Sequence, residues 1–155
     1  MSVPDIHTLV PHSGAMSLLS RFVEADAETL SAEVDIGLGS MFCVDGAVGA
    51  WVGVEYMAQA VAAHAGWCAR QRGEPVRVGF LLGSRKYSCT VASFPAGGTL
   101  RIHVHRALQG ENGLGAFDCR IEDGRGGSGG AVLATATITV FQPDHVEEFL
   151  QRSSV

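Results

Sequence analysis

The hydrophobic and polar positions of the chain separate one long apolar segment from several alternating ones. Residues 46–67 are apolar on nearly every side of a helix, and only Glu55, Gln59 and His64 are strongly polar. A helix that is hydrophobic all round is buried in a protein core or in a membrane. An acid near its middle and the lack of a flanking Lys or Arg cluster favour the protein core. We therefore expect one long buried helix and no membrane span.

Shorter segments before and after this helix alternate with a period of two. Residues 29–36 place apolar side chains on one face and polar ones on the other, as in a half-buried strand. Asp45 is the expected N-cap of the helix and Gly73 its C-cap. Gly79 and Gly83 indicate a bulge or a close backbone approach in the next strand. The other expected elements are strands at 76–90, 99–109, 114–122 and 131–141, turns at 94–98, 110–113 and 124–130, and short helical segments at 5–9 and 143–152.

This order of elements predicts an α+β fold in which a coiled antiparallel sheet wraps around the central helix. The 155 residues are expected to form a single domain over 1–155. A sheet that wraps the helix from one side leaves its other flank open. A second copy of the chain would cover that flank, so we expect a homodimer.

The net charge and the cysteines argue against some classes of function and indicate a cellular compartment. The formal net charge of −5 gives no electrostatic support to nucleic-acid binding. The four cysteines lie far apart and form no C-x-x-C pair, which argues against a zinc site and for buried thiols in a reducing compartment. The N-terminus has neither the basic flank nor the apolar run of a signal peptide. We expect a cytoplasmic protein.

Three segments resemble the 3-hydroxyacyl-ACP dehydratase branch of the hotdog fold. PHSGAMSLLSR at 11–21 resembles the branch's N-terminal P-H-R-x-P-F-L-L-V-D-R. AWVGVEYMAQA resembles its helix motif P-G-V-L-I-I-E-A-M-A-Q-A, with Glu55 and Gln59 on the acid and the glutamine. FLLGSRKYSCTVASFPAGGTL resembles its Y-F-A-G-I-D-x-x-x-F-x-x-P-V-x-P-G-D segment. The segments WVGVEYMAQ and GFLLGSRKY are similar to those of a divergent branch of dehydratases associated with aryl-polyene-type lipid pathways.

The resemblance implies a lyase of fatty-acid or polyene lipid biosynthesis. Such an enzyme removes water from 3-hydroxyacyl thioesters carried by acyl carrier protein, and it uses neither cofactor nor metal. A histidine removes the C2 proton, and the acid at Glu55 protonates the departing C3 hydroxyl. Backbone N–H groups around Gly49 and Ala50 polarise the thioester carbonyl, and Gln59 completes the substrate-binding set.

The chain departs from that branch at the catalytic histidine. The usual G-H-F-P is replaced by GSMFCVDG, with Met41 near the histidine position, and no histidine occurs from Ser13 to Ala63. The expected base is therefore His12, in a turn shaped by proline; its other role would be to orient that turn. Glu55 is open to a structural interpretation too, as a side chain that fixes the dimer.

Two further functions stay open on the same residues. One is an acyl thioesterase in which Glu55 activates a water, which requires no histidine. The other is a non-catalytic subunit that binds acyl chains or supports a partner. Five basic residues would either attract an acidic carrier protein or be solvated, and they are Arg70, Arg72, Arg77, Arg85 and Lys86.

The remaining histidines have simpler interpretations. His64 lies nine positions after Glu55, half a turn out of phase, and is expected to be a satisfied core or interface residue. His103 and His105 share the polar face of one strand, and solvent exposure is favoured over metal binding because no third ligand is evident. His7 and His145 are expected at the surface.

Overall fold

The strands that follow the long helix lie close to where the sequence predicts them, and the helix itself ends as predicted but begins later. The computed structural model describes residues 3–9, 17–75, 80–110, 112–124 and 130–141. The predicted tail helix at 143–152, Gly79 and most of the glycine run lie outside the described residues. The elements are η1 (Ile6–Thr8), β1 (Arg21–Ala25), β2 (Thr29–Asp35), β3 (Cys43–Val44), β4 (Ala47–Gly49), η3 (Ala50–Val52), α1 (Gly53–Gln71), β5 (Phe80–Cys89), β6 (Ser93–Pro95), β7 (Thr99–Gln109), β8 (Leu114–Asp123) and β9 (Val132–Phe141).

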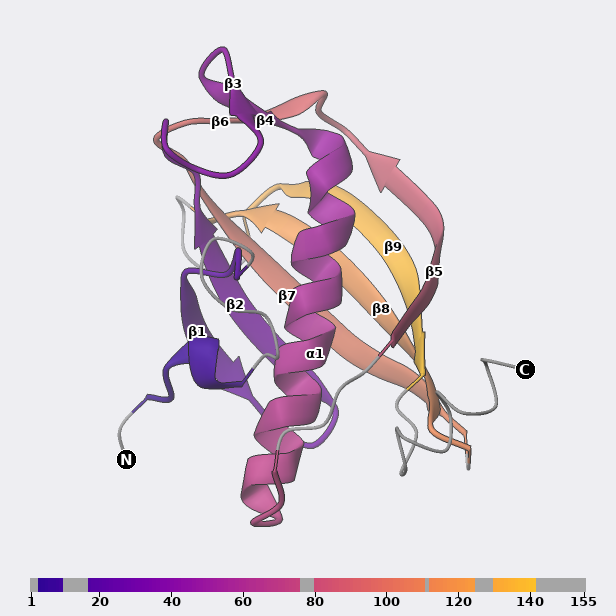
Figure 1. Ribbon diagram of the computed structural model, residues 1–155. Coiled ribbons are helices and arrows are strands. Elements are labelled where there is room, and N and C mark those ends of the chain that lie inside the picture. The colour runs from indigo at the N-terminus through magenta and orange to yellow at the C-terminus, as the bar shows by residue number, and fades with distance from the viewer. Residues whose placement is uncertain (1–2, 10–16, 76–79, 111, 125–129, 142–155) are drawn as a thin grey trace, which may run out of the picture.

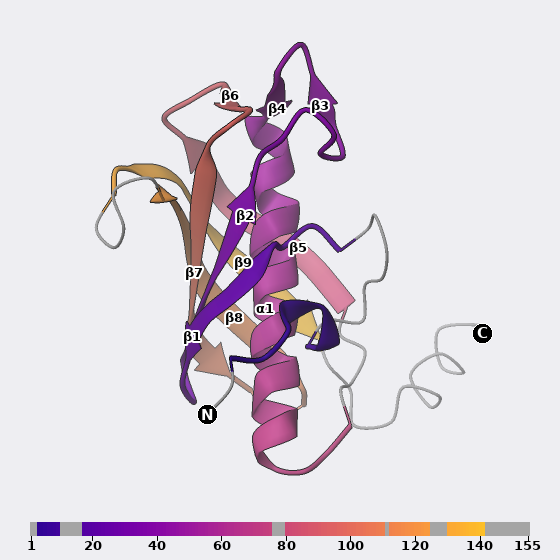
Figure 2. The same cartoon turned by 90° about the vertical axis from the view of Figure 1, so that its left-hand side faces the viewer.

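A six-stranded sheet curves around α1. Its strand order is β1-β2-β7-β8-β9-β5, and every neighbouring pair is antiparallel. A second, three-stranded sheet of order β3-β4-β6 lies at the N-terminal end of the helix (Figure 1). The view turned by 90° shows α1 against one face of the large sheet (Figure 2). The predicted α+β arrangement is therefore confirmed.

Alternation along the strands decides which face meets the helix. In β2 the side chains of Leu30, Ala32 and Val34 are buried, and Leu30 lies opposite Val104 of β7 in the antiparallel register. The intervening polar side chains point to the outer face of the sheet, away from α1. Because the period is two, one sheet face forms the core and the other carries a row of charged and polar groups.

The helix begins later than the sequence predicted. Asp45 and Gly46 have φ values of 53° and 77°, and Val44 pairs with Ala47 across them. Positive φ at both central positions is typical of a two-residue type I′ hairpin, for which Asp-Gly is a preferred sequence. Asp45 is therefore a hairpin residue and not the helix N-cap, and α1 starts only at Gly53.

The other end of the helix agrees with the prediction. Gly73 has φ 69° directly after the C-cap Arg72. The N–H of Glu74 bonds to the carbonyl of Ala69, and the N–H of Gly73 bonds to that of Arg70. This is the Schellman arrangement, which glycine adopts without the strain that a Cβ would impose.

Short strands and bulges complete the framework. The strands β1, β3, β4 and β6 were not predicted, because none carries a long alternating pattern. The expected irregularity at Gly83 is confirmed by a shift in the β5–β9 register between Leu81 and Gly83. Among the described residues no helix is long and apolar enough to cross a membrane.

One flank of α1 stays partly exposed. Val54, Ala58 and Ala62 are half-buried, whereas Met57, Ala60 and Ala63 on the opposite side are fully covered by the sheet. The half-buried positions recur every four residues and so share one face of the helix. The four cysteines are free, but only Cys119 is fully buried, so the prediction of buried thiols holds for that residue alone.

Candidate active site

Glu55 lies in the first turn of α1 and not near the middle of the helix. The later helix start causes this difference from the sequence prediction. Aligned backbone N–H dipoles at a helix N-terminus stabilise a negative charge by about 0.3–1 kcal/mol. The side chain is half-buried, and Gln59 Nε2 donates a hydrogen bond to its Oε1 at 3.1 Å. The acid is thus tolerated in an apolar helix by its place at the N-terminus and by a bonded neighbour.

Gln59 is fully buried and bridges two parts of the chain. Its Nε2 donates to Glu55, and its Oε1 accepts the backbone N–H of Leu18 at 2.7 Å. Both ends of the amide therefore contact protein groups. Gln59 holds the carboxyl group of Glu55 and also fixes the segment that follows residue 16 onto the helix.

A second contact fixes the segment that precedes residue 10. Leu9 is buried, and its carbonyl packs so closely on Gly66 that a Cβ at Gly66 would overlap with it. His12, the predicted base, lies between Leu9 and Leu18 in the sequence and outside the described residues. The two ends of its segment are both held against α1.

Of the predicted donors at Gly49 and Ala50, the N–H of Ala50 is engaged within the protein. Gly49 ends β4 and pairs with Ser93, and the N–H of Ala50 bonds to the carbonyl of Ala92 at 3.0 Å. The N–H of Ala50 is therefore already used, which the sequence did not reveal. The next N–H group, of Trp51, precedes the first carbonyl of the 3-10 turn Ala50–Val52, whereas the N–H of Val52 lies three residues after the N-cap Gly49 and is used within that turn.

Two aromatic side chains cover the glycines at the start of the helix. A Cβ at Gly49 would lie 2.5 Å from Trp51 Nε1, so the indole lies over this position. A Cβ at Gly53 would collide with the Tyr87 hydroxyl, which donates to the carbonyl of Ala50. Burial raises the pKa of Tyr87 well above its usual range, so this phenol stays protonated. Only glycine allows these aromatic groups to approach the backbone.

A cavity of about 410 Å³ lies beside this end of the helix. Met41, which lies near the position expected for the family's histidine, lines it together with Tyr56. His7 lines it too, and its Nδ1 is 2.8 Å from Ser17 Oγ. His7 is exposed as predicted, but its place in the lining of this cavity was missed. The sequence motif does not predict His7 in this cavity, because the packing of the N-terminal segment brings it there.

His64 belongs to the core and not to the site. It is fully buried, its Nε2 lies 3.0 Å from the carbonyl of Asp26, and its ring packs edge-on against Phe117. Burial lowers its pKa, so the ring is neutral at neutral pH. The core prediction is confirmed, although Nδ1 has no hydrogen-bond partner among the described residues.

His103 differs from the expected solvent-exposed residue. Its side chain is 19% exposed and contacts Ser31 and Glu122, whereas that of His105 is 54% exposed. Exposure was thus right for His105 and wrong for His103. Among the described residues no three His, Cys, Asp or Glu side chains are arranged to bind a metal ion.

The predicted basic residues do not all point freely to solvent. Arg70 donates to Thr8 Oγ1 at 2.7 Å, and Arg72 pairs with Glu74 at 3.2 Å. Arg85 and Lys86 are exposed on β5, and Arg77 lies outside the described residues. Part of the positive charge is therefore compensated within the chain.

Several solved structures share this architecture. A chain of the dehydratase heterocomplex ApeI:P from Xenorhabdus doucetiae is 27% identical, with a TM-score of 0.85 over 97% of this chain and 98% of that one. Thioesterase HI1161 from Haemophilus influenzae is 12% identical, with a TM-score of 0.66 over 92% and 90%. A hypothetical thioesterase with coenzyme A from Streptococcus pneumoniae is 14% identical, with a TM-score of 0.59 over 79% and 84%. No curated protein matches the chain.

These likenesses identify the class of fold first. A long helix wrapped by an antiparallel sheet, with an acid at the helix start, defines a hotdog-fold protein. The model of the ApeP-like family, described as ApeP dehydratase, matches residues 4–151. The chain therefore belongs to the ApeP dehydratase family, and it is a dehydratase, a lyase. The resemblance to this branch that was drawn from the sequence is confirmed.

Proposed function

We propose that this dehydratase acts on 3-hydroxyacyl thioesters carried by acyl carrier protein, with Glu55 as the acid and His12 as the base. One observation carries the proposal. The carboxyl group of Glu55 stands half-buried at the start of α1 and is held there by Gln59, which also anchors the segment that contains His12. A positioned acid and base next to one reacting group is what elimination of water requires.

The reaction balances with these two groups alone. His12 takes the C2 proton, the electron pair of that bond forms the C2=C3 double bond, and the C3–O bond breaks. Glu55 gives its proton to the departing hydroxyl, which leaves as water. Return of the proton from the imidazolium to the carboxylate, directly or through solvent, restores both groups for the next turnover.

The anchors on each side of His12 support its assignment. Leu9 contacts Gly66, and Leu18 bonds to Gln59, so the intervening segment is tied to α1 at two points. Those points are seven positions apart, or about 10 Å along the helix. Gln59 is one turn from Glu55, so the end of the segment at Leu18 is held close to the acid, and we propose that His12 acts on the same substrate.

The thioester carbonyl is the third group to position. We assign its recognition to the Gly49–Val52 segment, where the N–H of Trp51 supplements that of Gly49 and replaces that of Ala50, which is bonded to Ala92. Donors held in place before the reaction stabilise the charge that develops on the oxygen. Gln59 contributes by fixing Glu55 in addition to its predicted place in the binding set.

The enzyme is proposed to work in the cytoplasm as an assembly of hotdog subunits. The half-buried flank of α1, with Val54, Ala58 and Ala62, supports a subunit interface. A homodimer is the predicted form, and the ApeI:P heterocomplex supports pairing with a second dehydratase subunit as the other form. The exposed Arg85 and Lys86 would face the acidic carrier protein.

The decisive assay uses one substrate and distinguishes three outcomes. A 3-hydroxyacyl carrier protein is incubated either with this chain alone or with this chain and a second dehydratase subunit of the ApeI type. The mass of the acyl group is then measured by mass spectrometry. Loss of water that depends on this chain supports the proposal. Release of free thiol would indicate a thioesterase, and binding without a mass change would indicate a non-catalytic subunit.

A further inference from the structure

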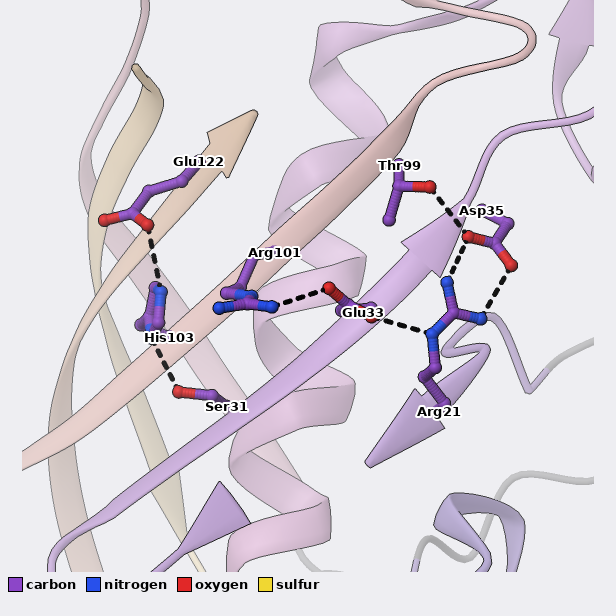
Figure 3. Close-up of polar contacts among 8 residues, drawn as sticks. All are labelled: Arg21, Ser31, Glu33, Asp35, Thr99, Arg101, His103 and Glu122. Atoms are coloured by element: carbon purple, nitrogen blue, oxygen red, sulfur yellow. Dashed lines mark hydrogen bonds and ion pairs between the residues drawn. The ribbon is translucent and has the colours of Figure 1, made fainter. Parts of the chain in front are cut away.

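A serine, a histidine and a glutamate are joined by hydrogen bonds on the outer face of the sheet, away from α1. Ser31 of β2 lies directly opposite His103 of β7 in the register, and its Oγ is 2.6 Å from Nδ1 of the ring. The other ring nitrogen, Nε2, is 3.1 Å from Oε2 of Glu122 on β8. Figure 3 shows the three side chains in one line across three strands. None of them takes part in the proposed dehydration.

The direction of each hydrogen bond follows from the donors present. An ionised carboxylate only accepts, so the proton on Nε2 is donated to Glu122. A neutral ring then carries its lone pair on Nδ1, and Ser31 Oγ–H must donate to it. A hydroxyl that donates to an imidazole, which in turn donates to a carboxylate, is the arrangement of an activated nucleophile.

The surroundings keep the two titratable groups in these states. Burial is the main cause that lowers the pKa of His103, so the ring is neutral at neutral pH. Burial alone would raise the pKa of Glu122, but hydrogen bonds from Arg120 and His103 hold it below its usual range. Ser31 is 6% exposed and Glu122 is 5% exposed. The charged groups around the ring are Arg101, Arg120 and Glu122, and Glu24, His105 and Asp118 line the same pocket.

A pocket of about 380 Å³ opens onto this cluster. Ser31, His103 and Glu122 all line it, so a small acyl group that enters would meet the hydroxyl. Arg120 also lines the pocket, and its Nε is bonded to Glu122 Oε1 at 2.7 Å. The remaining N–H groups of its guanidinium are donors for an oxygen that becomes negative during acyl transfer.

We propose that Ser31, His103 and Glu122 form a second site, which cleaves short-chain carboxylic esters through an acyl-serine. Ser31 Oγ attacks the ester carbonyl carbon, and its proton passes to His103 Nδ1. The ester C–O bond breaks, and the alcohol leaves with the proton from Nδ1. Water then attacks the acyl-serine with His103 as its base, which releases the carboxylic acid and restores the hydroxyl. Glu122 is a positioning residue, because it acts on the ester only through the ring.

The test uses a fluorophosphonate, which reacts with activated serines, and p-nitrophenyl acetate as the substrate. We expect one phosphonyl group per chain, mapped to Ser31 by peptide mass spectrometry, and ester hydrolysis above background. Ser31→Ala should abolish both signals, and His103→Gln should slow labelling by about 100-fold. Ser84→Ala, on an exposed strand position, is the matched control, and Glu55→Gln should leave labelling unchanged because the two sites are separate.

Glu122→Gln separates positioning from mere structural support. The ionised Glu122 raises the proton affinity of the ring, so its removal should shift the pH of half-maximal labelling downward and slow the plateau rate. A purely structural role would leave that pH unchanged in the folded variant. Failure to find the label on Ser31 of the wild-type protein would overturn the proposal, even if the variants unfold. An equal labelling rate in folded His103→Gln would overturn it as well.

Discussion

The amide of Gln59 and the backbone of Leu18, 41 positions apart, are joined by a 2.7 Å hydrogen bond. The same amide donates to Glu55, so one buried side chain connects the N-terminal segment with the proposed catalytic acid. A displacement of that segment would therefore be transmitted to the carboxyl group. Misplacement of a reacting group by about 1 Å is enough to reduce a rate about 100-fold.

Gln59→Leu should weaken both the fold and the reaction. The substitution keeps a similar volume but leaves the Leu18 N–H without its acceptor, which costs about 1–3 kcal/mol when a donor is buried. We expect the free energy of unfolding to fall by that amount in urea, and the dehydration rate to fall further than stability alone explains. Gln71→Leu, at the exposed end of α1, is the control and should change neither value. An active, fully stable Gln59→Leu variant would show that the bridge has no function.

Glu55→Gln should retain the fold and lose turnover. The amide preserves the shape and can still bond to Gln59, but it has no acidic proton for the departing hydroxyl. We expect a rate about 100-fold to 10,000-fold lower, in the range assigned to general acid catalysis. Glu28→Gln is the control, because the Glu28 side chain is 72% exposed. A near-normal rate in a folded Glu55→Gln variant would make this acid structural.

The alternation of apolar and polar residues along the longer strands made most of the fold predictable. Residues 99–105 alternate with a period of two, and β7 spans Thr99–Gln109 as predicted. The start of the helix was not predictable in the same way, because Asp45 suits both an N-cap and a type I′ hairpin. The decision depends on the pairing of β4 with β6, whose residues lie far apart in the sequence.

The site residues were predictable only where a sequence motif contains the residues that carry the chemistry. Glu55 and Gln59 could be assigned from the helix motif, although the motif did not show that Gln59 bonds to Leu18. The cluster at Ser31 was missed, because its three members come from three strands and look like ordinary polar positions of alternating segments. Cross-strand register creates that cluster, and register is fixed by the whole sheet.

Gly66→Ala should destabilise the protein even though alanine favours a helix. Alanine normally gains about 1 kcal/mol over glycine inside a helix. Here the new Cβ would overlap with the backbone carbonyl of Leu9, which is buried and cannot move away as a flexible side chain would. Overpacking of this kind costs about 1–3 kcal/mol, so we expect a net loss in chemical denaturation. Gly39→Ala, with no atom within 4 Å, should stay within about 0.5 kcal/mol of wild type.

Stability should fall as the pH drops through the histidine range. Burial holds the pKa of His64 and of His103 below the ordinary value of 6.5. The unfolded chain therefore binds more protons than the folded one once the pH falls to about 6.5, which favours unfolding. Urea unfolding between about pH 7.5 and 5.5 should reveal this loss. His103→Gln should make the dependence shallower, and exposed His105→Gln should not; equal slopes in all three proteins would contradict the prediction.

His12→Ala should abolish dehydration, because the reaction requires a base at hydrogen-bonding distance from the C2 proton. The family's usual position holds Met41 or its neighbours, none of which readily accepts that proton at neutral pH. The matched control is His7→Ala, since His7 lines the cavity beside Met41 and is bonded to Ser17. We expect a loss of about 100-fold or more for His12→Ala and a small change for His7→Ala, with binding of the unreacted thioester retained in both. A reversed result would move the base to His7, and full activity in both variants would remove histidine from the mechanism. Deuterium exchange at C2, measured on the recovered 3-hydroxyacyl thioester, identifies the proton-transfer step, because a variant that lacks the base should lose exchange and elimination together.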